Sequence, residues 1–185
     1  QSMRETHPTC MSSVPRFWEK VYQAVLDKID RSSVAKQRLF RHALEVGRRY
    51  NIDCKSRCKR PSPLLAMEYK LFDKMILRLV RKQIGLENAH LFPTAGATVS
   101  PAVERFVHSV GINMIVGYGL TESLATVSCD REDMQFTIGS VGRPINGLQV
   151  KIGDNDEILL KGSTITPGYY KRDAVNKEAF TEDGF

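Results

Sequence analysis

The sequence predicts an α/β fold, and three features of the chain carry this prediction. Residues 17–84 hold three amphipathic helical segments in a row, which indicates a helical layer. Two apolar runs, residues 90–98 and 112–116, each lead into a turn of small residues, with a helical stretch between them. Residues 125–170 are rich in short alternating runs and turn formers. We therefore expect a parallel βαβ sheet with a helical layer and a β-rich C-terminal portion.

The first helix is predicted over residues 17–29, after a short, mostly buried strand at residues 7–14 and a turn at Pro15. Trp18, the only tryptophan, stands at the start of this helix. We predict that it is an aromatic anchor in the core rather than a gate for a ligand. Apolar side chains recur along the helix every four residues, at Phe17, Val21, Val25 and Ile29.

Two further helices are expected before the first apolar run. Ser32 and Ser33 are the predicted N-cap of a helix that runs from about residue 34 to residue 49. The third helix is expected over residues 64–84, where a broad apolar face precedes a stop at Gly85. The segment between them, residues 51–63, is polar, basic and proline-containing, so it is predicted to be a loop.

The next segment has the order of a βαβ unit. A strand runs into a turn around Gly96, and Ser100 with Pro101 then begins a helix. The second strand, residues 112–116, ends directly at Gly117. Since the carboxyl ends of parallel strands meet at one edge of a sheet, we expect Gly96 and Gly117 to flank one crevice. Open α/β sheets bind their ligands at that edge.

The heptapeptide Gly-Tyr-Gly-Leu-Thr-Glu-Ser that follows the second strand is the candidate site. Gly117 and Gly119 permit backbone angles that a side chain would resist, and they let another molecule approach the main chain. Tyr118 offers a flat ring, while Thr121 and Glu122 add a hydroxyl and a carboxylate. Together these groups suit a nucleotide and its metal ion, and the alternative is a glycine-rich turn with exposed polar residues.

The remainder of the chain is predicted to be β-rich, with a charged loop at residues 130–135. We assign residues 1–150 to an α/β subdomain that contains the three helices and the βαβ unit. Residues 151–185 are assigned to a hairpin and the start of a following β-rich subdomain. The expected elements after the heptapeptide are strands at residues 125–129, 148–152 and 157–161, the last two forming the hairpin, and a short helix at residues 173–180.

Composition and charge exclude some classes of protein. Of the 185 residues, 42% are hydrophobic and 26% charged, which is ordinary for a globular protein, and no apolar run approaches the ~20 residues of a membrane-spanning helix.

The net charge of +6 lies largely in the first half, as in the basic cluster at residues 55–60. Such a cluster can bind phosphate, nucleic acid or an anionic membrane. No aromatic residues interleave with it, so a solvated loop is favoured and no nucleic-acid partner is expected.

The cysteines predict free thiols rather than a metal site. Cys54 and Cys58 are four residues apart, but no second cysteine pair or histidine pair completes a zinc set. The chain also begins without the architecture of a signal peptide. We therefore expect a reducing, cytoplasmic location.

Several segments resemble those of the adenylate-forming enzymes, which include acyl-CoA synthetases, luciferases and peptide-synthetase adenylation domains. The heptapeptide resembles the core motif of this superfamily, and three further blocks follow or precede it in the same order. Residues 13–22 resemble the long-chain fatty acid–CoA ligase branch. The ordered blocks are residues 94–100, 117–123, 139–150 and 157–170.

The resemblance implies an ATP-dependent ligase with a fatty acid, ATP and CoA as its small-molecule partners. The fatty acid would be converted with ATP to acyl-AMP, and CoA would then displace AMP. By similarity Thr121 would bind the α-phosphate, Glu122 would hold Mg²⁺ and Tyr118 would lie along the adenine ring. The resemblance adds to the ATP and AMP site the backbone of Gly117, Gly119 and Leu120, and the small residues Gly96, Ala97 and Thr98, which would line the adenine and acyl pockets.

The resemblance also implies a part of a larger N-terminal domain. The phosphate-binding loop of these enzymes, their ribose-binding Asp and the C-terminal domain with its catalytic lysine have no counterpart in the 185 residues. We therefore expect an internal fragment that is inactive by itself, from a parent that is cytoplasmic or peripheral at a membrane. The alternatives are another carboxylate-adenylating enzyme and a nucleotide-binding or interaction module without catalysis.

Overall fold

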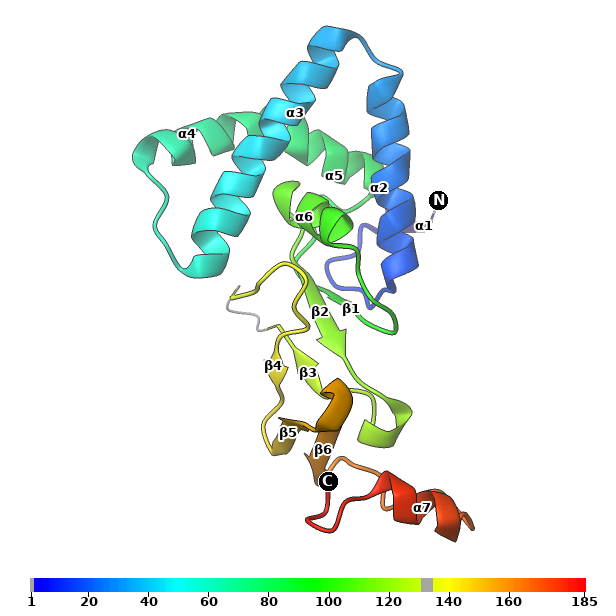
Figure 1. Ribbon diagram of the computed structural model, residues 1–185. Coiled ribbons are helices and arrows are strands. Elements are labelled where there is room, and N and C mark those ends of the chain that lie inside the picture. The colour runs from blue at the N-terminus through cyan, green and yellow to red at the C-terminus, as the bar shows by residue number, and fades with distance from the viewer. Residues whose placement is uncertain (1, 131–134) are drawn as a thin grey trace.

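A computed structural model describes residues 2–130 and 135–185 of the chain. Figure 1 shows the long helices gathered at the end that holds the N-terminus, above a small sheet. The hairpin of β5 and β6 and the helix α7 lie at the opposite end, beside the C-terminus. The expected α/β architecture, a helical layer with a β-rich C-terminal portion, is therefore confirmed.

The three predicted helices are present, after a short helix α1 (Ser2–Thr6) that was not predicted. Helix α2 spans Pro15–Asp30 and α3 spans Val34–Arg48. The third helix consists of three consecutive pieces that end at Gly85, whose φ of 86° is left-handed. These pieces are α4 (Pro63–Phe72), the π-helical turn η3 (Asp73–Leu77) and α5 (Arg78–Ile84).

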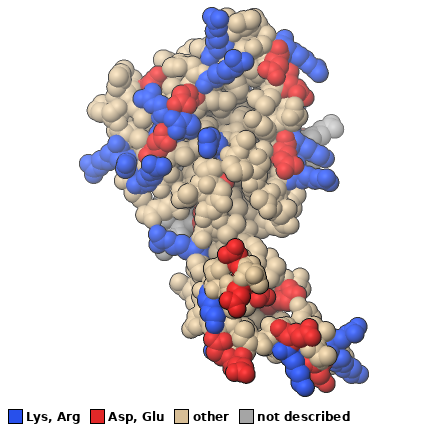
Figure 2. All heavy atoms as spheres, in the orientation of Figure 1, with Lys and Arg blue, Asp and Glu red and all other residues tan. Residues whose placement is uncertain are grey.

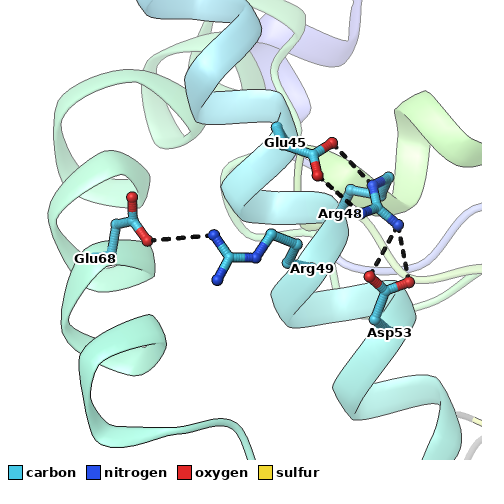
Figure 3. A network of polar contacts seen from close by, with 5 residues as sticks. All are labelled: Glu45, Arg48, Arg49, Asp53 and Glu68. Atoms are coloured by element: carbon cyan, nitrogen blue, oxygen red, sulfur yellow. Dashed lines mark hydrogen bonds and ion pairs between the residues drawn. The ribbon is translucent and has the colours of Figure 1, made fainter.

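The prediction of a loop over residues 51–63 is wrong for its first half. The π-helix η1 (Arg49–Cys54) and the 3₁₀ turn η2 (Lys55–Arg57) continue from the end of α3. Figure 3 shows the reason, because Arg48 lies between two carboxylates, Glu45 at 2.8 Å and Asp53 at 2.8 Å. In the same turn Tyr50 stacks on Tyr69 of α4, with ring centroids 4.0 Å apart. Local ion pairs of Arg48 and the stacking of Tyr50 on another helix thus hold the chain in a helical turn after α3.

The same network ties η1 to α4. Arg49 reaches across to Glu68 of α4, with 3.7 Å between the guanidinium and the carboxylate (Figure 3). The buried side-chain amide of Asn51 donates to the hydroxyl of Tyr69 at 3.3 Å. These contacts fix the turn between the two helices against α4.

The predicted βαβ unit is confirmed. Strand β1 (Phe92–Thr94) pairs in parallel with β2 (Met114–Tyr118), and α6 (Pro101–Ser109) connects them. Antiparallel partners β3 (Ser128–Cys129) and β4 (Arg143–Pro144) extend the sheet in the order β1-β2-β3-β4. The two parallel strands are therefore adjacent, and their carboxyl ends leave the sheet at one edge.

The strand predicted at residues 7–14 is reduced to two isolated bridges. Cys10 pairs with Leu91 and Ser13 pairs with Thr94, both in parallel with β1. The paired stretch stays short because Pro15 already begins α2.

The core lies between the sheet and helices α2, α3 and α6. Trp18 is fully buried there, and its ring meets Phe92 of β1 edge-on at 5.8 Å. Its indole N–H donates to the hydroxyls of Ser13 at 2.8 Å and Thr94 at 2.9 Å. Trp18 is thus the predicted anchor, and it also fixes the end of β1. Other fully buried members of this core are Leu77, Leu86, Val107 and Val110.

The C-terminal portion contains the predicted hairpin and helix. Strand β5 (Leu148–Ile152) pairs antiparallel with β6 (Ile158–Gly162), and α7 spans Asp173–Ala179. The strand predicted at residues 125–129 shortens to β3, because Leu124 and Ala125 take positive φ values of 50° and 84°. Most of the charged loop predicted at residues 130–135 lies outside the described residues. The division after residue 150 falls inside β5 and stays a prediction.

Two buried titratable side chains on α6 were missed in the sequence. Glu104 and His108 lie one turn apart and are both buried against the loop that follows β3. A Glu104 carboxylate oxygen accepts from the N–H of Gly139 at 2.8 Å, and the His108 ring stacks on Phe136 at 3.8 Å. Burial raises the pKa of Glu104 to about 7 and lowers the pKa of His108 to about 3.

The raised pKa of Glu104 predicts a pH-dependent stability. Its folded pKa of about 7 exceeds the ordinary value of 4.5, so its contribution to stability is full below pH 4.5 and is lost as the pH rises through 7. In Glu104→Gln we expect the free energy of unfolding to fall less between pH 5 and pH 8 than in the wild type. The difference should be on the order of 1–3 kcal/mol in urea titrations at the two pH values.

The control for this prediction is Glu178→Gln, which neutralises an exposed carboxylate on α7. The contribution of His108 to the stability changes in the opposite direction, because it is lost as the pH falls below 6.5. This loss is expected to be equal in all three proteins. If Glu104→Gln and Glu178→Gln show the same pH dependence as the wild type, Glu104 does not carry the effect.

Candidate active site at the carboxyl edge of the sheet

The parallel pair brings the predicted site residues to one edge of the sheet. Thr94, the last residue of β1, is the register partner of Val116, two residues before the end of β2. The loop with Gly96, Ala97 and Thr98 leaves β1 there, and all three residues are exposed. The heptapeptide begins within the last residues of β2 and leaves at the same edge. Both loops that were expected to flank a crevice thus leave the sheet at the same edge.

The two glycines of the heptapeptide differ in the space that the fold leaves for a side chain. A Cβ on Gly119 would lie 1.4 Å from the carbonyl oxygen of Ala125, so no side chain fits. A Cβ on Gly117 would meet its nearest heavy atom, the carbonyl oxygen of Ser128, at an ordinary 3.4 Å. Neither has a positive φ, whereas Gly96 has a φ of +94°. The close approach predicted for another molecule is therefore made at Gly119 by the chain's own backbone.

A short 3₁₀ turn, η4 (Thr121–Ser123), sets the direction of the polar side chains. Ser123 is buried, and its hydroxyl accepts from the N–H of Leu120 and donates to the carbonyl of Leu120, both at 3.0 Å. This closed turn leaves Leu120 and Thr121 exposed at the edge. Ser123 is thus a structural member of the motif, whereas Thr121 is an exposed residue.

The carboxylate of Glu122 is held by a residue far along the chain. The hydroxyl of Tyr169 donates to Glu122 Oε1 at 2.7 Å, and the N–H of Thr166 donates to the Glu122 carbonyl at 2.7 Å. The hydrogen bond from Tyr169 holds the pKa of Glu122 below its usual value, so the group is ionised at neutral pH. Sequence reasoning placed Tyr169 in a family block but did not connect it with Glu122.

The backbone of Tyr118 is fixed while its side chain remains partly exposed. It pairs with Ser128 across β2 and β3, and its carbonyl accepts from the N–H of Val127 at 2.8 Å. The end of β2 is therefore tied to β3.

A metal ion at this edge would depend on Glu122 together with ligands from the substrate. In the described part of the chain no group of three or more His, Cys, Asp or Glu side chains could form a cage. Mg²⁺ commonly takes one or two carboxylates and completes its shell with phosphate oxygens and water. The single ionised carboxylate of Glu122 fits that arrangement. All four cysteines are free, as predicted.

Comparison with known proteins identifies the family of the chain. The family model described as AMP-binding enzyme matches residues 1–170. The chain belongs to the AMP-binding enzyme family. The heptapeptide at the carboxyl edge of the sheet thus lies within the matched part of the chain. The match confirms the family resemblance seen in the sequence.

Relatives of this AMP-binding chain include long-chain-fatty-acid–CoA ligases. It is 30% identical over 180 residues to the long-chain-fatty-acid–CoA ligase FadD15 of Mycobacterium bovis, covering 96% of this chain and 29% of that protein. It is 27% identical over 189 residues to the long-chain-fatty-acid–CoA ligase ACSBG1 of Rattus norvegicus, covering 100% of this chain and 25% of that protein. The chain therefore spans between a quarter and a third of the length of these relatives.

Solved structures share the fold of this AMP-binding chain. A malonyl-CoA ligase in a ternary product complex with methylmalonyl-CoA and AMP superposes with a TM-score of 0.56 at 18% identity, covering all of this chain and 31% of that one. Unliganded O-succinylbenzoate coenzyme A synthetase from Bacillus subtilis gives a TM-score of 0.54 at 14% identity, covering 98% and 28%. At these identities the likeness establishes the fold.

Proposed function

We propose that the chain is a part of a long-chain fatty acid–CoA ligase that forms acyl-AMP from a fatty acid and ATP and then acyl-CoA. One structural observation supports this proposal more strongly than the others. Exposed Thr121 and the ionised Glu122 follow each other in the turn η4 at the carboxyl edge of the parallel strands, where Tyr169 holds the Glu122 carboxylate. Relatives named as long-chain-fatty-acid–CoA ligases support the choice of acyl substrate.

In the first step a fatty acid carboxylate oxygen attacks the α-phosphorus of ATP, and the bond from that phosphorus to pyrophosphate breaks. Bringing an anion onto a polyphosphate needs positioning and neutralisation of charge. Thr121 would donate a hydrogen bond to the α-phosphate, and Glu122 would hold Mg²⁺. The bound ion would supply a positive charge next to the phosphate oxygens.

In the second step the CoA sulfur attacks the acyl carbonyl carbon, the bond to AMP breaks, and the thiol proton is released. For both steps the adenylate must stay in place. The ring of Tyr118 would lie along the adenine, beside the backbone of Gly117, Gly119 and Leu120. The exposed loop with Gly96, Ala97 and Thr98 would line the adenine and acyl pockets, since small side chains leave room for them.

We infer that the chain alone is inactive. It spans 25% of one ligase relative and 29% of another. Groups needed for the reaction, such as a phosphate-binding loop and a catalytic lysine, would be supplied by other parts of a longer protein. Fatty acid, ATP and CoA would be its partners, with peripheral attachment to a membrane.

A product assay tests this proposal. The whole protein is incubated with ATP, Mg²⁺, CoA and fatty acids of increasing chain length, and the products are identified by mass spectrometry. We expect acyl-CoA and AMP in equal amounts, with the highest yield for long chains. The highest yield from a short or aromatic acid would indicate another carboxylate-adenylating enzyme. Formation of ADP, or no acyl-CoA from any acid, would contradict the proposal.

A further inference from the structure

Helix α7 is joined to the heptapeptide by a series of hydrogen bonds between residues that are distant in the sequence. The series begins at Asn176 in α7, passes through Tyr169 and ends at the carboxylate of Glu122. Its three hydrogen bonds are between 2.7 and 3.0 Å long. Figure 1 shows α7 next to the C-terminus, at the end of the molecule opposite the long helices. We call Asn176, Tyr169 and Glu122 the relay.

The side-chain amide of Asn176 holds both main-chain groups of Tyr169. Its oxygen accepts from the Tyr169 N–H at 2.7 Å, and its NH₂ group donates to the Tyr169 carbonyl at 3.0 Å. Gly168 permits this approach, because its φ is +139° and a Cβ there would lie 3.0 Å from the Asn176 side chain. Two hydrogen bonds to one residue fix its orientation as well as its position. Asn176 therefore sets the direction in which Tyr169 points.

The helix itself does not require an asparagine at this position. Asparagine is a weak helix former, and Asn176 lies inside a helix of seven residues, where its side chain reaches back to the preceding turn. No helix of the described ranges could cross a membrane, and α7 in particular is short and without a buried residue. Polar contacts, rather than burial in the core, thus hold α7 against the turn that contains Tyr169.

That turn holds Glu122 at two points. The Tyr169 hydroxyl donates to Glu122 Oε1, and the Thr166 N–H donates to the Glu122 carbonyl, both at 2.7 Å. The Thr166 hydroxyl closes the turn from within, since it accepts from the N–H of Gly168 at 3.3 Å and donates to the Gly168 carbonyl at 3.2 Å. The position of the turn therefore determines where the Glu122 carboxylate points.

The partner of the Glu122 carboxylate is a neutral group. None of the ion pairs within residues 2–130 and 135–185 includes Glu122, and its hydrogen-bond donor is a phenol. Residues 101–185 contain 8 Lys and Arg against 12 Asp and Glu, and Figure 2 shows several Asp and Glu on the β-rich part of the molecule. A phenol directs the carboxylate without cancelling its charge, so the charge is available to a cation.

We propose that Asn176 is a positioning residue for Glu122 and that it acts through Tyr169. The Asn176 amide orients Tyr169, and the Tyr169 hydroxyl directs the carboxylate that holds Mg²⁺ in the proposed reaction. Hydrogen-bond partners behind a metal ligand commonly orient that ligand and adjust the affinity for the metal. The inference rests on the proposed function for the role of Glu122. The alternative is a local role, in which Asn176 stabilises α7 and leaves Glu122 unaffected.

Fluorine NMR of the whole protein, without Mg²⁺ or nucleotide, tests the relay directly. The tyrosines are replaced biosynthetically by 3-fluorotyrosine, and the resonance that is absent in Tyr169→Phe belongs to Tyr169. Glu122→Ala removes the acceptor of the Tyr169 hydroxyl and shows how the resonance moves when this contact is lost. We expect Asn176→Ala to move it in the same direction and by a comparable amount, because Tyr169 is then no longer oriented towards the carboxylate.

Two further variants decide whether the shift comes from the relay. Lys177→Ala changes the neighbouring exposed residue of α7 and should leave the resonance in place. Asn176→Asp keeps an oxygen that accepts from the Tyr169 N–H but loses the donor to the Tyr169 carbonyl, so its shift should be smaller. Circular dichroism should show that all variants are folded. An unmoved resonance in both Asn176 variants, or an equal shift in Lys177→Ala, would overturn the proposal.

A double-mutant cycle shows whether Asn176 acts on the metal site through Tyr169. Its readout is the rate of AMP formation by the whole protein at a Mg²⁺ concentration below saturation. We expect a loss of about 5-fold in Tyr169→Phe and about 3-fold in Asn176→Ala, in keeping with one lost hydrogen bond each. The double variant should lose about 5-fold rather than the product of about 15-fold, because Asn176 then has no hydroxyl to direct. Excess Mg²⁺ should restore the rate of Asn176→Ala. Losses that multiply, or that persist at every Mg²⁺ concentration, would overturn the proposal.

The two experiments separate this inference from the proposed function. If Asn176→Ala moves the Tyr169 resonance while Glu122→Gln leaves the Mg²⁺ dependence unchanged, the relay stands and Glu122 does not hold the metal ion. If Glu122→Gln loses Mg²⁺-dependent AMP formation while Asn176→Ala changes neither readout, the relay is refuted and the proposed function stands.

Discussion

Replacing Glu122 with glutamine is expected to lower Mg²⁺-dependent adenylation by the whole protein about 100-fold or more. The variant keeps an oxygen to accept the hydrogen bond that Tyr169 donates at 2.7 Å, so the turn should stay in place. What it loses is the negative charge that would hold the cation against the phosphates. The measurement is the initial rate of AMP formation at saturating ATP, over a range of Mg²⁺ concentrations.

Tyr169→Phe is the matched control for this prediction. It keeps the carboxylate and removes the hydrogen bond that lowers the pKa of Glu122. At pH 7 an ordinary glutamate is still ionised, so the rate should fall by only about 5-fold, in keeping with one lost hydrogen bond. A Glu122→Gln variant with an unchanged Mg²⁺ dependence would show that Glu122 does not hold the metal ion.

Replacing Gly119 with alanine is expected to destabilise the protein by about 3 kcal/mol or more and to abolish nucleotide binding. The added Cβ would lie 1.4 Å from the carbonyl oxygen of Ala125, and backbone atoms cannot move aside as a flexible side chain can. Relief of the clash must displace the turn that presents Thr121 and Glu122. Urea unfolding and ATP binding by calorimetry measure the two effects.

Gly117→Ala is the control, two residues away in the same motif. Its Cβ would make an ordinary contact at 3.4 Å, and its φ is not positive, so stability should change by less than about 1 kcal/mol. Equal effects of the two alanine substitutions would show that the close approach at Gly119 does not shape the site.

Local sequence patterns correctly predicted the helices and strands whose formation depends on residues within the same segment. The four-residue spacing of Phe17, Val21 and Val25 and the Pro101 start of α6 are readable within one segment, and both helices formed where expected. The order of strand, helix and strand was sufficient to place the loops of Gly96 and Gly117 at one edge. The segments that resemble the adenylate-forming enzymes then indicated that this edge binds a nucleotide.

Features that depend on distant partners could not be predicted. The helical turn that begins at residue 49 is held in part by the stacking of Tyr50 on Tyr69, a residue of another helix. Glu122 and Tyr169 are 47 residues apart, and no periodicity relates them. The burial of Glu104 under the loop that contains Gly139 likewise becomes visible only in the folded chain.

Exchange of labelled pyrophosphate into ATP, in the absence of CoA, tests the central claim most directly. Formation of acyl-AMP and pyrophosphate is reversible, so a protein that adenylates a fatty acid must incorporate the label only when that acid and Mg²⁺ are present. We predict such exchange with long-chain fatty acids for the whole protein, and its loss in Glu122→Gln. Exchange that is absent, or that proceeds equally without any carboxylic acid, would contradict the assignment of this sheet edge as an adenylation site.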